Sequence, residues 1–185
     1  AAPDLGSGVV RRVGSSPISR TKNKLEAFKI LSWRLFNWLD MNKHQLCCIG
    51  HITLDKVVTP QNTVYMPGGT AFYCSHAIRH FNDIDYALVT AVGATEMNVV
   101  EQLREMGIHI TALPSKYSVY FENIYGANPD DRTQRVLAKA DPFTAGQLKD
   151  IDAQIYHLGS LLADDFSLEV IKELSQKGLI AVDSQ

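Results

Sequence analysis

The chain has 185 residues, of which 45% are hydrophobic and 21% are charged. These values are typical of a soluble globular domain, and they exclude a collagen-like, a wholly disordered or a polytopic membrane protein. The net charge of −2 gives no reason to expect nucleic acid as a partner. No run of about 18 apolar residues is present, so we expect no membrane span.

Charge divides the chain near residue 40. Residues 1–40 contain seven basic and three acidic side chains, whereas residues 41–185 contain eleven basic and seventeen acidic ones. The start of the chain is rich in Gly, Ser and Pro, which predicts disorder, and the leucine spacing over 25–39 predicts a short amphipathic helix. This pattern fits a transit peptide or a membrane-surface helix. We favour a basic leader or non-native extension without a functional role, because Met41 precedes an apolar strand as a natural start would.

From residue 46 onward, apolar strands alternate with amphipathic helices. Repeated strand–helix–strand units of about 25–30 residues predict an α/β fold with a doubly wound, mainly parallel sheet. The last strand begins close to Gln185, so we expect a domain that is cut short at its C-terminus. The expected strands cover 46–49, 86–92, 108–113, 155–158 and 179–182, and the expected helices cover 71–81, 97–106, 145–152 and 167–177.

Two β-prone segments interrupt this alternation. Residues 57–66 are polar and contain Pro60, which predicts an exposed ribbon. Residues 118–139 contain two alternating stretches around the turn signal Asn128-Pro-Asp-Asp131, which predicts an inserted hairpin. Such ribbons can cover a crevice and exclude water from it. A dimerisation sheet or a decorative insertion is the alternative interpretation.

Candidate binding residues follow the ends of the first two predicted elements. Asp55 comes just after the first strand, where ligands collect in doubly wound sheets, and its carboxylate can accept hydrogen bonds from two vicinal hydroxyls. Gly68 and Gly69 precede a helix, so the backbone there can approach a ligand and offer free N–H donors. A turn-capping role for Asp55 and a simple tight turn at the glycines are the alternatives. The segment matches neither of the glycine-rich phosphate-binding patterns G-x-x-x-x-G-K-[ST] and G-x-G-x-x-G.

Further candidates lie on the hairpin and near the end of the chain. Asn123 has Phe121 and Tyr125 at i±2, so one strand face can present an amide between two aromatic rings. Asp164 and Asp165 follow a predicted strand, and we expect them to cap the next helix rather than to contact a substrate.

The cysteines and histidines show no metal-binding spacing. Cys47 and Cys48 would point to opposite faces of a strand, which suits neither a shared metal nor an easy disulfide. His76 and His80 lie one helical turn apart but lack a nearby third ligand. We therefore expect no metal site, and we interpret all three cysteines, Cys74 included, as buried thiols of a cytoplasmic protein.

In order along the chain, these elements resemble the ribokinase-like (PfkB) carbohydrate kinase family from about Leu46 to Gln185. The hairpin resembles the family's lid, and the Leu-x-x-x-Gly-Ile pattern ends the second helix. The combined order of the pieces is more specific than any single piece. The segments that carry the resemblance are Cys48–Asp55, Pro67–Tyr73, Thr90–Gly93, Leu103–Ile108, 119–139 and Tyr156–Ser160.

The resemblance implies transfer of a phosphoryl group from ATP, with Mg²⁺, to a hydroxyl of a sugar or related polyol. It implies that Asp55 binds substrate hydroxyls, that Gly68 and Gly69 hold the sugar close to the backbone, and that a lid of residues 57–66 and 118–139 closes over it. Thr70 and Asn123 complete the candidate substrate site. Lid strands of this family often pair between subunits, so a homodimer is compatible with the resemblance.

Two departures from the family pattern matter. Tyr73 stands where family ribokinases usually have Asn, and Val92-Gly-Ala-Thr-Glu96 replaces Val-Gly-x-Asp, so another polyol is favoured over ribose. The Gly-Ala-Gly-Asp segment, which supplies the family's anion hole and catalytic aspartate, occurs nowhere in the chain. We therefore expect the catalytic residues downstream of Gln185 and an inactive fragment. A non-catalytic sugar- or nucleoside-binding module is the alternative, and a dinucleotide enzyme is disfavoured because G-x-G-x-x-G is missing.

Overall fold

A computed structural model describes residue 29 and residues 43–81, 83–128 and 130–183. The chain divides into two units, residues 1–40 and 41–185. The helix expected over 25–39 lies outside the described residues except for Lys29, which is helical and exposed. No described helix has the length and apolar character that a membrane crossing needs.

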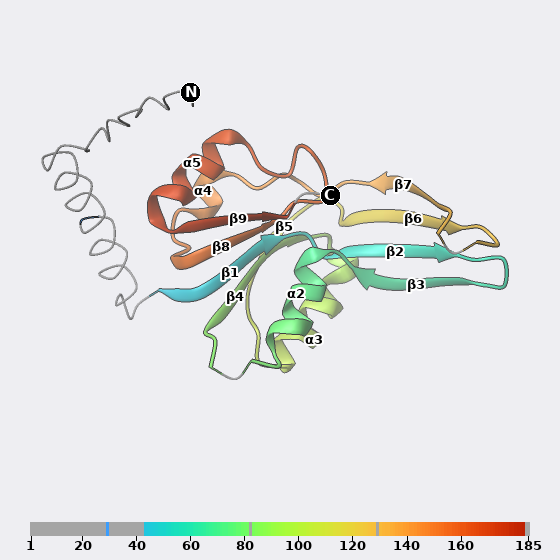
Figure 1. Cartoon of the computed structure of the whole chain (residues 1–185), viewed down its shortest axis with the longest axis horizontal. Helices are drawn as coiled ribbons and strands as arrows, with labels where there is room; N and C mark the ends of the chain where they lie inside the picture. The colour runs from blue at the N-terminus through green and yellow to red at the C-terminus, as the bar shows by residue number, and fades with distance from the viewer. Residues whose placement is uncertain (1–28, 30–42, 82, 129, 184–185) are drawn as a thin grey trace, which may run out of the picture. The chain divides into compact units, whose positions relative to one another are not determined.

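Five parallel strands form the main sheet of the second unit, in the order β5-β4-β1-β8-β9 (Figure 1). β4 is buried along its whole length, as expected for a parallel strand that is covered on both faces. The doubly wound parallel sheet predicted from the sequence is therefore confirmed. The strands are β1 (His44–Gly50), β4 (Tyr86–Val92), β5 (His109–Pro114), β8 (Ala153–Gly159) and β9 (Leu179–Asp183).

Helices cover both faces of this sheet (Figure 1). One face packs against α2 (Thr70–Ile78) and α3 (Met97–Glu105), through a core that includes Cys48, Leu88 and Leu103. The opposite face packs against α4 (Ala145–Leu148) and α5 (Leu168–Lys177). Cys47 and Cys48, as neighbours on β1, belong to opposite cores, as the period-2 geometry of a strand requires.

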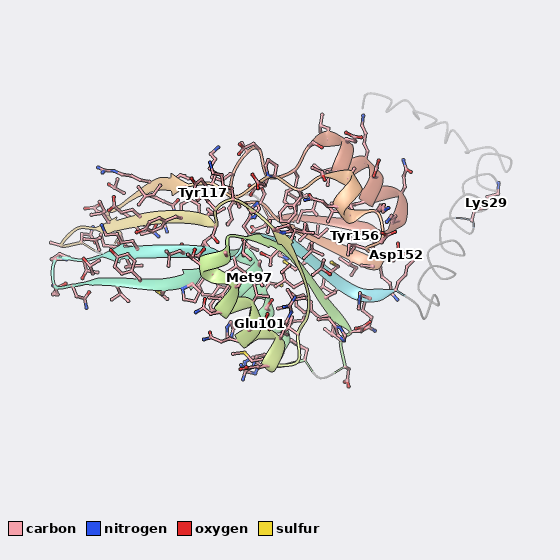
Figure 2. All side chains as sticks on the ribbon, turned by 180° about the vertical axis from the view of Figure 1, so that it is seen from behind. Lys29, Met97, Glu101, Tyr117, Asp152 and Tyr156 are labelled. Atoms are coloured by element: carbon pink, nitrogen blue, oxygen red, sulfur yellow. The ribbon has the colours of Figure 1, made fainter. Side chains whose placement is uncertain are left out.

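The second sheet has four strands in the order β3-β2-β6-β7. It extends from the end of the main sheet at which the parallel strands finish (Figure 1), and its side chains project from both faces (Figure 2). β2 pairs antiparallel with β3 and parallel with β6, and β6 pairs antiparallel with β7. We call this the lid sheet. Its strands are β2 (Thr53–Val58), β3 (Thr63–Gly68), β6 (Val119–Tyr125) and β7 (Arg132–Ala138).

The expected bounds of the first ribbon were wrong at its start. β2 begins at Thr53, only three residues after β1 ends, so Asp55 lies within a lid strand rather than in a turn after β1. Pro60 occupies the tight connection between β2 and β3, where the Thr59 N–H donates to the Asn62 carbonyl at 2.9 Å. A proline fits there because no ladder hydrogen bond requires its missing N–H.

Candidate functional site

A cavity of about 1130 Å³ lies between the lid sheet and the start of α2. The lid supplies one wall through β2, β6 and β7, and α2 and the end of β9 supply the other. The cavity is large enough for a small organic ligand. Its lining comprises Asp55, Val57, Thr59, Pro60, Gln61, Met66, Gly69, Thr70, Tyr73, Phe121, Asn123, Tyr125, Gly126, Ala127, Arg132, Gln134 and Asp183.

The Asp55 carboxylate lies directly against the backbone of Gly68. β2 and β3 pair so that Thr53 is opposite Gly68, and the Thr53 hydroxyl donates to Asp55 Oδ1 at 2.7 Å. A Cβ atom at Gly68 would lie 2.5 Å from Asp55 Oδ2 and 3.0 Å from the Thr53 hydroxyl oxygen. Any side chain at position 68 would therefore displace the carboxylate from its place in the cavity.

Gly69 makes the sharp turn that starts α2. Its φ angle is +88°, a left-handed conformation that favours glycine. A Cβ atom there would also lie 2.5 Å from the His51 carbonyl oxygen. The next residue, Thr70, donates from its hydroxyl to Asp183 Oδ2 at 3.1 Å. The glycine pair thus brings the first turn of α2 against both β2 and the end of β9.

Charge at the base of the cavity is mixed. Burial raises the pKa of Asp55 above its ordinary value, although the Thr53 hydrogen bond and the Arg132 guanidinium oppose this rise. Arg132 itself lines the cavity, as does the carboxylate of Asp183. Such an arrangement offers hydrogen-bond acceptors at the floor and a cation at the lid, which suits a neutral or singly substituted polyol better than an apolar ligand.

The lid wall combines an amide with two aromatic rings. Asn123 is buried, and Phe121 and Tyr125 lie on the same side of β6 and also line the cavity. Asn123 Oδ1 accepts a hydrogen bond from Gln134 Nε2 on β7 at 3.0 Å, which fixes the amide orientation. One cavity is therefore lined by four of the five predicted site residues, Asp55, Gly69, Thr70 and Asn123. The fifth, Gly68, packs against the Asp55 carboxylate.

Sequence reasoning missed four residues that line the cavity. Asp183 ends β9, so the rule that ligands collect at the carboxyl ends of parallel strands could have found it. Arg132 and Gln134 lie two residues apart on β7 and thus share a face, but the hairpin register had to be known first. Tyr73 was noted only as a departure from a family pattern, although it lines the cavity.

The expectation that Asp165 caps a helix was wrong. Ser167 is the N-cap of α5 and accepts from the Val170 N–H. Asp165 is buried and accepts instead from the N–H groups of Leu161 and Leu162, at 2.8 and 2.9 Å. Although burial raises the pKa of Asp165, these hydrogen bonds and the His51 ring hold it below its ordinary value.

His51 links this carboxylate to the glycine turn. Its ring is fully buried, stacks on Phe143 at 4.5 Å, and places Nε2 3.4 Å from Asp165 Oδ1. Its backbone carbonyl is the atom that lies closest to the position of a Cβ at Gly69. The loops after β1 and β8 are thereby tied together beneath the cavity floor.

Comparison with known proteins gives matches among solved structures only: no family model and no curated protein matches the chain. A pyrophosphate-dependent kinase in the ribokinase family, solved as a sulfate complex, is 25% identical with a TM-score of 0.65, over 75% of this chain and 50% of that one. The chain has the ribokinase-like fold. The fold class and the family resemblance drawn from the motifs are confirmed at this level.

Two further ribokinase-like structures show which ligands this fold accommodates elsewhere. A pyrophosphate-dependent kinase in the family, complexed with a pyrophosphate analog and myo-inositol, is 22% identical with a TM-score of 0.63, over 75% of this chain and 48% of its own. Phosphofructokinase-2 from Escherichia coli, complexed with fructose-6-phosphate, is 17% identical with a TM-score of 0.57, over 77% and 55%. The chain thus spans about half the length of these sugar and polyol kinases.

Proposed function

We propose that this chain is the acceptor-binding half of a kinase that phosphorylates a hydroxyl of a sugar or related polyol. The observation that carries the proposal is the Asp55 carboxylate, held by Thr53 against the bare backbone of Gly68 at the wall of the cavity. The ribokinase-like fold supports a kinase rather than an unrelated binding protein.

In this proposal, Asp55 orients the acceptor. A carboxylate accepts hydrogen bonds from two neighbouring hydroxyls at once, and hydrogen bonds to a charged group are the stronger ones. Gly69 lets the ligand approach the backbone where α2 begins, and Thr70 and Asp183 lie beside it. The amide of Asn123 and the rings of the lid wall then cover the polyol and exclude water, which strengthens these polar contacts.

The described residues do not fit ATP and Mg²⁺. Among the described cavity residues the only full positive charge is that of Arg132, and this charge already interacts with the Asp55 carboxylate. A triphosphate needs cations and free backbone N–H groups around it. The family segment that supplies them, Gly-Ala-Gly-Asp, does not occur in the sequence. We therefore assign the donor to no residue of this chain, and pyrophosphate is an alternative donor to ATP because a similar structure uses it.

The binding proposal can be tested by thermal shift and calorimetry on the purified chain. Neutral polyols such as myo-inositol and ribose, a nucleoside, and fructose-6-phosphate form the panel, because ligand binding to the folded state raises apparent stability. At least one polyol should stabilise the wild type, and Asp55→Asn should abolish the shift. Gly146→Ala is the control, because a Cβ there meets nothing within 4 Å. If no polyol binds, or if Asp55→Asn binds equally well, the proposal fails.

Phosphoryl transfer forms a separate test. We expect no phosphorylation of the bound polyol by this chain with either ATP–Mg²⁺ or pyrophosphate–Mg²⁺, since no described residue holds a donor. Product would be measured by mass spectrometry. Turnover that disappears in Asp55→Ala would show that the chain is a complete kinase and would refute the half-site proposal while supporting the acceptor site.

We also propose that the lid sheet mediates self-association. The outer strands β3 and β7 expose apolar side chains, among them Tyr65 at 59% and Leu137 at 48% exposure. Exposed edge strands with apolar side chains tend to pair with another sheet. Light scattering should show a dimer that Tyr65→Lys converts to a monomer, and a wild-type monomer at high concentration would contradict the proposal.

A further inference from the structure

Three side chains with metal-binding atoms converge beneath α2, away from the cavity. They are Cys48 on β1, Cys74 on α2 and His157 on β8, and their sulfur and nitrogen atoms all lie within 4.8 Å of one another. Cys48 is fully buried, whereas Cys74 and His157 are half-buried, so an ion can reach the cluster from solvent. None of the three lines the polyol cavity.

Rigid elements, not a loop, bring these residues together. Cys48 and His157 are direct partners in the parallel pairing of β1 and β8, so their side chains project from the same face of the sheet. Gly50 and Gly159 follow two residues later on that face. A Cβ at Gly159 would lie 2.8 Å from Thr70 Cβ, which shows how closely the start of α2 approaches the strands.

The third ligand follows from this close approach. Cys74 lies one helical turn after Thr70, so both residues share the face of α2 that packs on the sheet. The turn of α2 that carries Cys74 is therefore pressed onto Cys48 and His157. A convergence that rests on strand pairing and helix packing is preorganised, as a metal site requires.

We propose that Cys48, Cys74 and His157 form a binding site for a thiophilic divalent cation such as Zn²⁺. Two thiolates and an imidazole are a ligand set that Zn²⁺ prefers, with Zn–S and Zn–N distances of about 2.3 and 2.0 Å. Three atoms that lie within 4.8 Å of one another are at most about 2.8 Å from a common centre, so side-chain shifts of at most about 0.5–0.8 Å give bonding distances. Solvent would fill the fourth position on the half-exposed side.

The surroundings support metal binding more than simple packing. The Cys74 thiol makes side-chain hydrogen bonds with Cys48 and with the His157 ring, so the three groups already contact one another. The Tyr86 hydroxyl, itself bonded to Ser75 Oγ at 3.0 Å, lies beside the same thiols and can support the ligands. Cys47 provides the contrast, since its thiol lies in the apolar core on the other face of β1 and belongs to no cluster of metal-binding atoms among the described residues.

Cobalt titration of the metal-free, fully reduced chain tests the site. Co²⁺ bound to two thiolates produces a sulfur-to-metal charge-transfer absorption. One equivalent of Zn²⁺ per chain should then displace the Co²⁺ and remove this absorption. We expect Cys48→Ser and Cys74→Ser to remove this absorption and His157→Ala to weaken Co²⁺ binding at least tenfold. Cys47→Ser, the matched control on the other face of β1, should bind as the wild type does.

Circular dichroism checks that each variant folds. Because Cys74 is only half-buried, the Cys74→Ser variant keeps the test valid if Cys48→Ser unfolds. Zn²⁺ should raise the melting temperature of the wild type and of Cys47→Ser but not of Cys74→Ser. Absence of the absorption in protein whose thiols are shown to be reduced would overturn the proposal. So would an unchanged absorption in Cys74→Ser, or a Cys48–Cys74 disulfide as the only product of metal and air exposure.

Discussion

Replacement of Gly68 by alanine isolates the contact on which the polyol site depends. The new Cβ would lie 2.5 Å from Asp55 Oδ2, whereas ordinary van der Waals contact begins at 3.4 Å. The carboxylate must therefore move by about 0.9 Å. Because a hydrogen bond tolerates only a few tenths of an ångström, such a shift should break at least one bond from Asp55 to a ligand hydroxyl.

The size of the effect follows from that lost bond. A hydrogen bond to a charged group contributes about 1.5–3 kcal/mol, so the Kd for the polyol should rise about 10- to 100-fold. The fold should lose little stability, because the displaced atom is the end of a side chain and Gly68 has no positive φ angle.

Isothermal titration calorimetry with the polyol that stabilises the wild type measures this change, and chemical denaturation measures the stability. Gly146→Ala adds the same methyl group in open space, so it should leave the Kd unchanged. Because position 146 lies within α4, this change should raise the stability by about 0.5–1 kcal/mol. If Gly68→Ala binds the polyol as tightly as the wild type, the Asp55 carboxylate does not contact the ligand and the reasoning is refuted.

Three further predictions concern the turn, the buried carboxylate and pH. Gly69→Ala and Gly107→Ala each place alanine in a left-handed conformation with φ near +88°, which costs about 1 kcal/mol. Only the new Cβ of Gly69→Ala also meets a backbone oxygen, so urea unfolding should show this variant to be at least about 3 kcal/mol less stable than the wild type. Equal losses of stability in the two variants would contradict this prediction. Asp165→Ala should lower the free energy of unfolding by about 3 kcal/mol at pH 7. Because the folded-state pKa of Asp165 is lowered, the difference in stability from the wild type should shrink as the pH falls through that pKa. A difference in stability that does not depend on pH would argue against a charged Asp165. Polyol binding should weaken as Asp55 is protonated, with a midpoint above the ordinary value of 3.8, and a flat calorimetric profile from pH 7 to 4 would count against the role of its carboxylate.

The main sheet could be predicted because its signals are local. β4 is an apolar run from Tyr86 to Val92 in which only Thr90 is polar, and its observed bounds match the expected ones. The helix expected over 145–152 begins at Ala145 behind a capping box of Thr144 and Gln147, a pattern of local residue types, although α4 ends at Leu148, earlier than expected. Glycine at position 107 ends α3 in a left-handed conformation, as such a stop signal predicts.

The candidate site was only partly predictable because it depends on pairing between distant strands. Asp55 could be singled out from its place after an apolar strand, but its contact with Gly68 required the β2–β3 register. The role of Asp165 could not be predicted because one of its partners, His51, follows β1 and is more than a hundred residues away in sequence. Likewise, the spacing of the cysteines along the chain gave no sign of a metal site. The cluster of Cys48, Cys74 and His157 forms only because β1, α2 and β8 pack together in the fold.

The most direct test of the polyol site is a double-mutant cycle between protein and ligand. Calorimetry compares the polyol with its analogue lacking one of two vicinal hydroxyls, each with the wild type and with Asp55→Asn. We expect a coupling energy of about 1–3 kcal/mol for at least one hydroxyl, because removing either partner breaks the same bond. Strictly additive losses at every hydroxyl would show that Asp55 does not hold the acceptor.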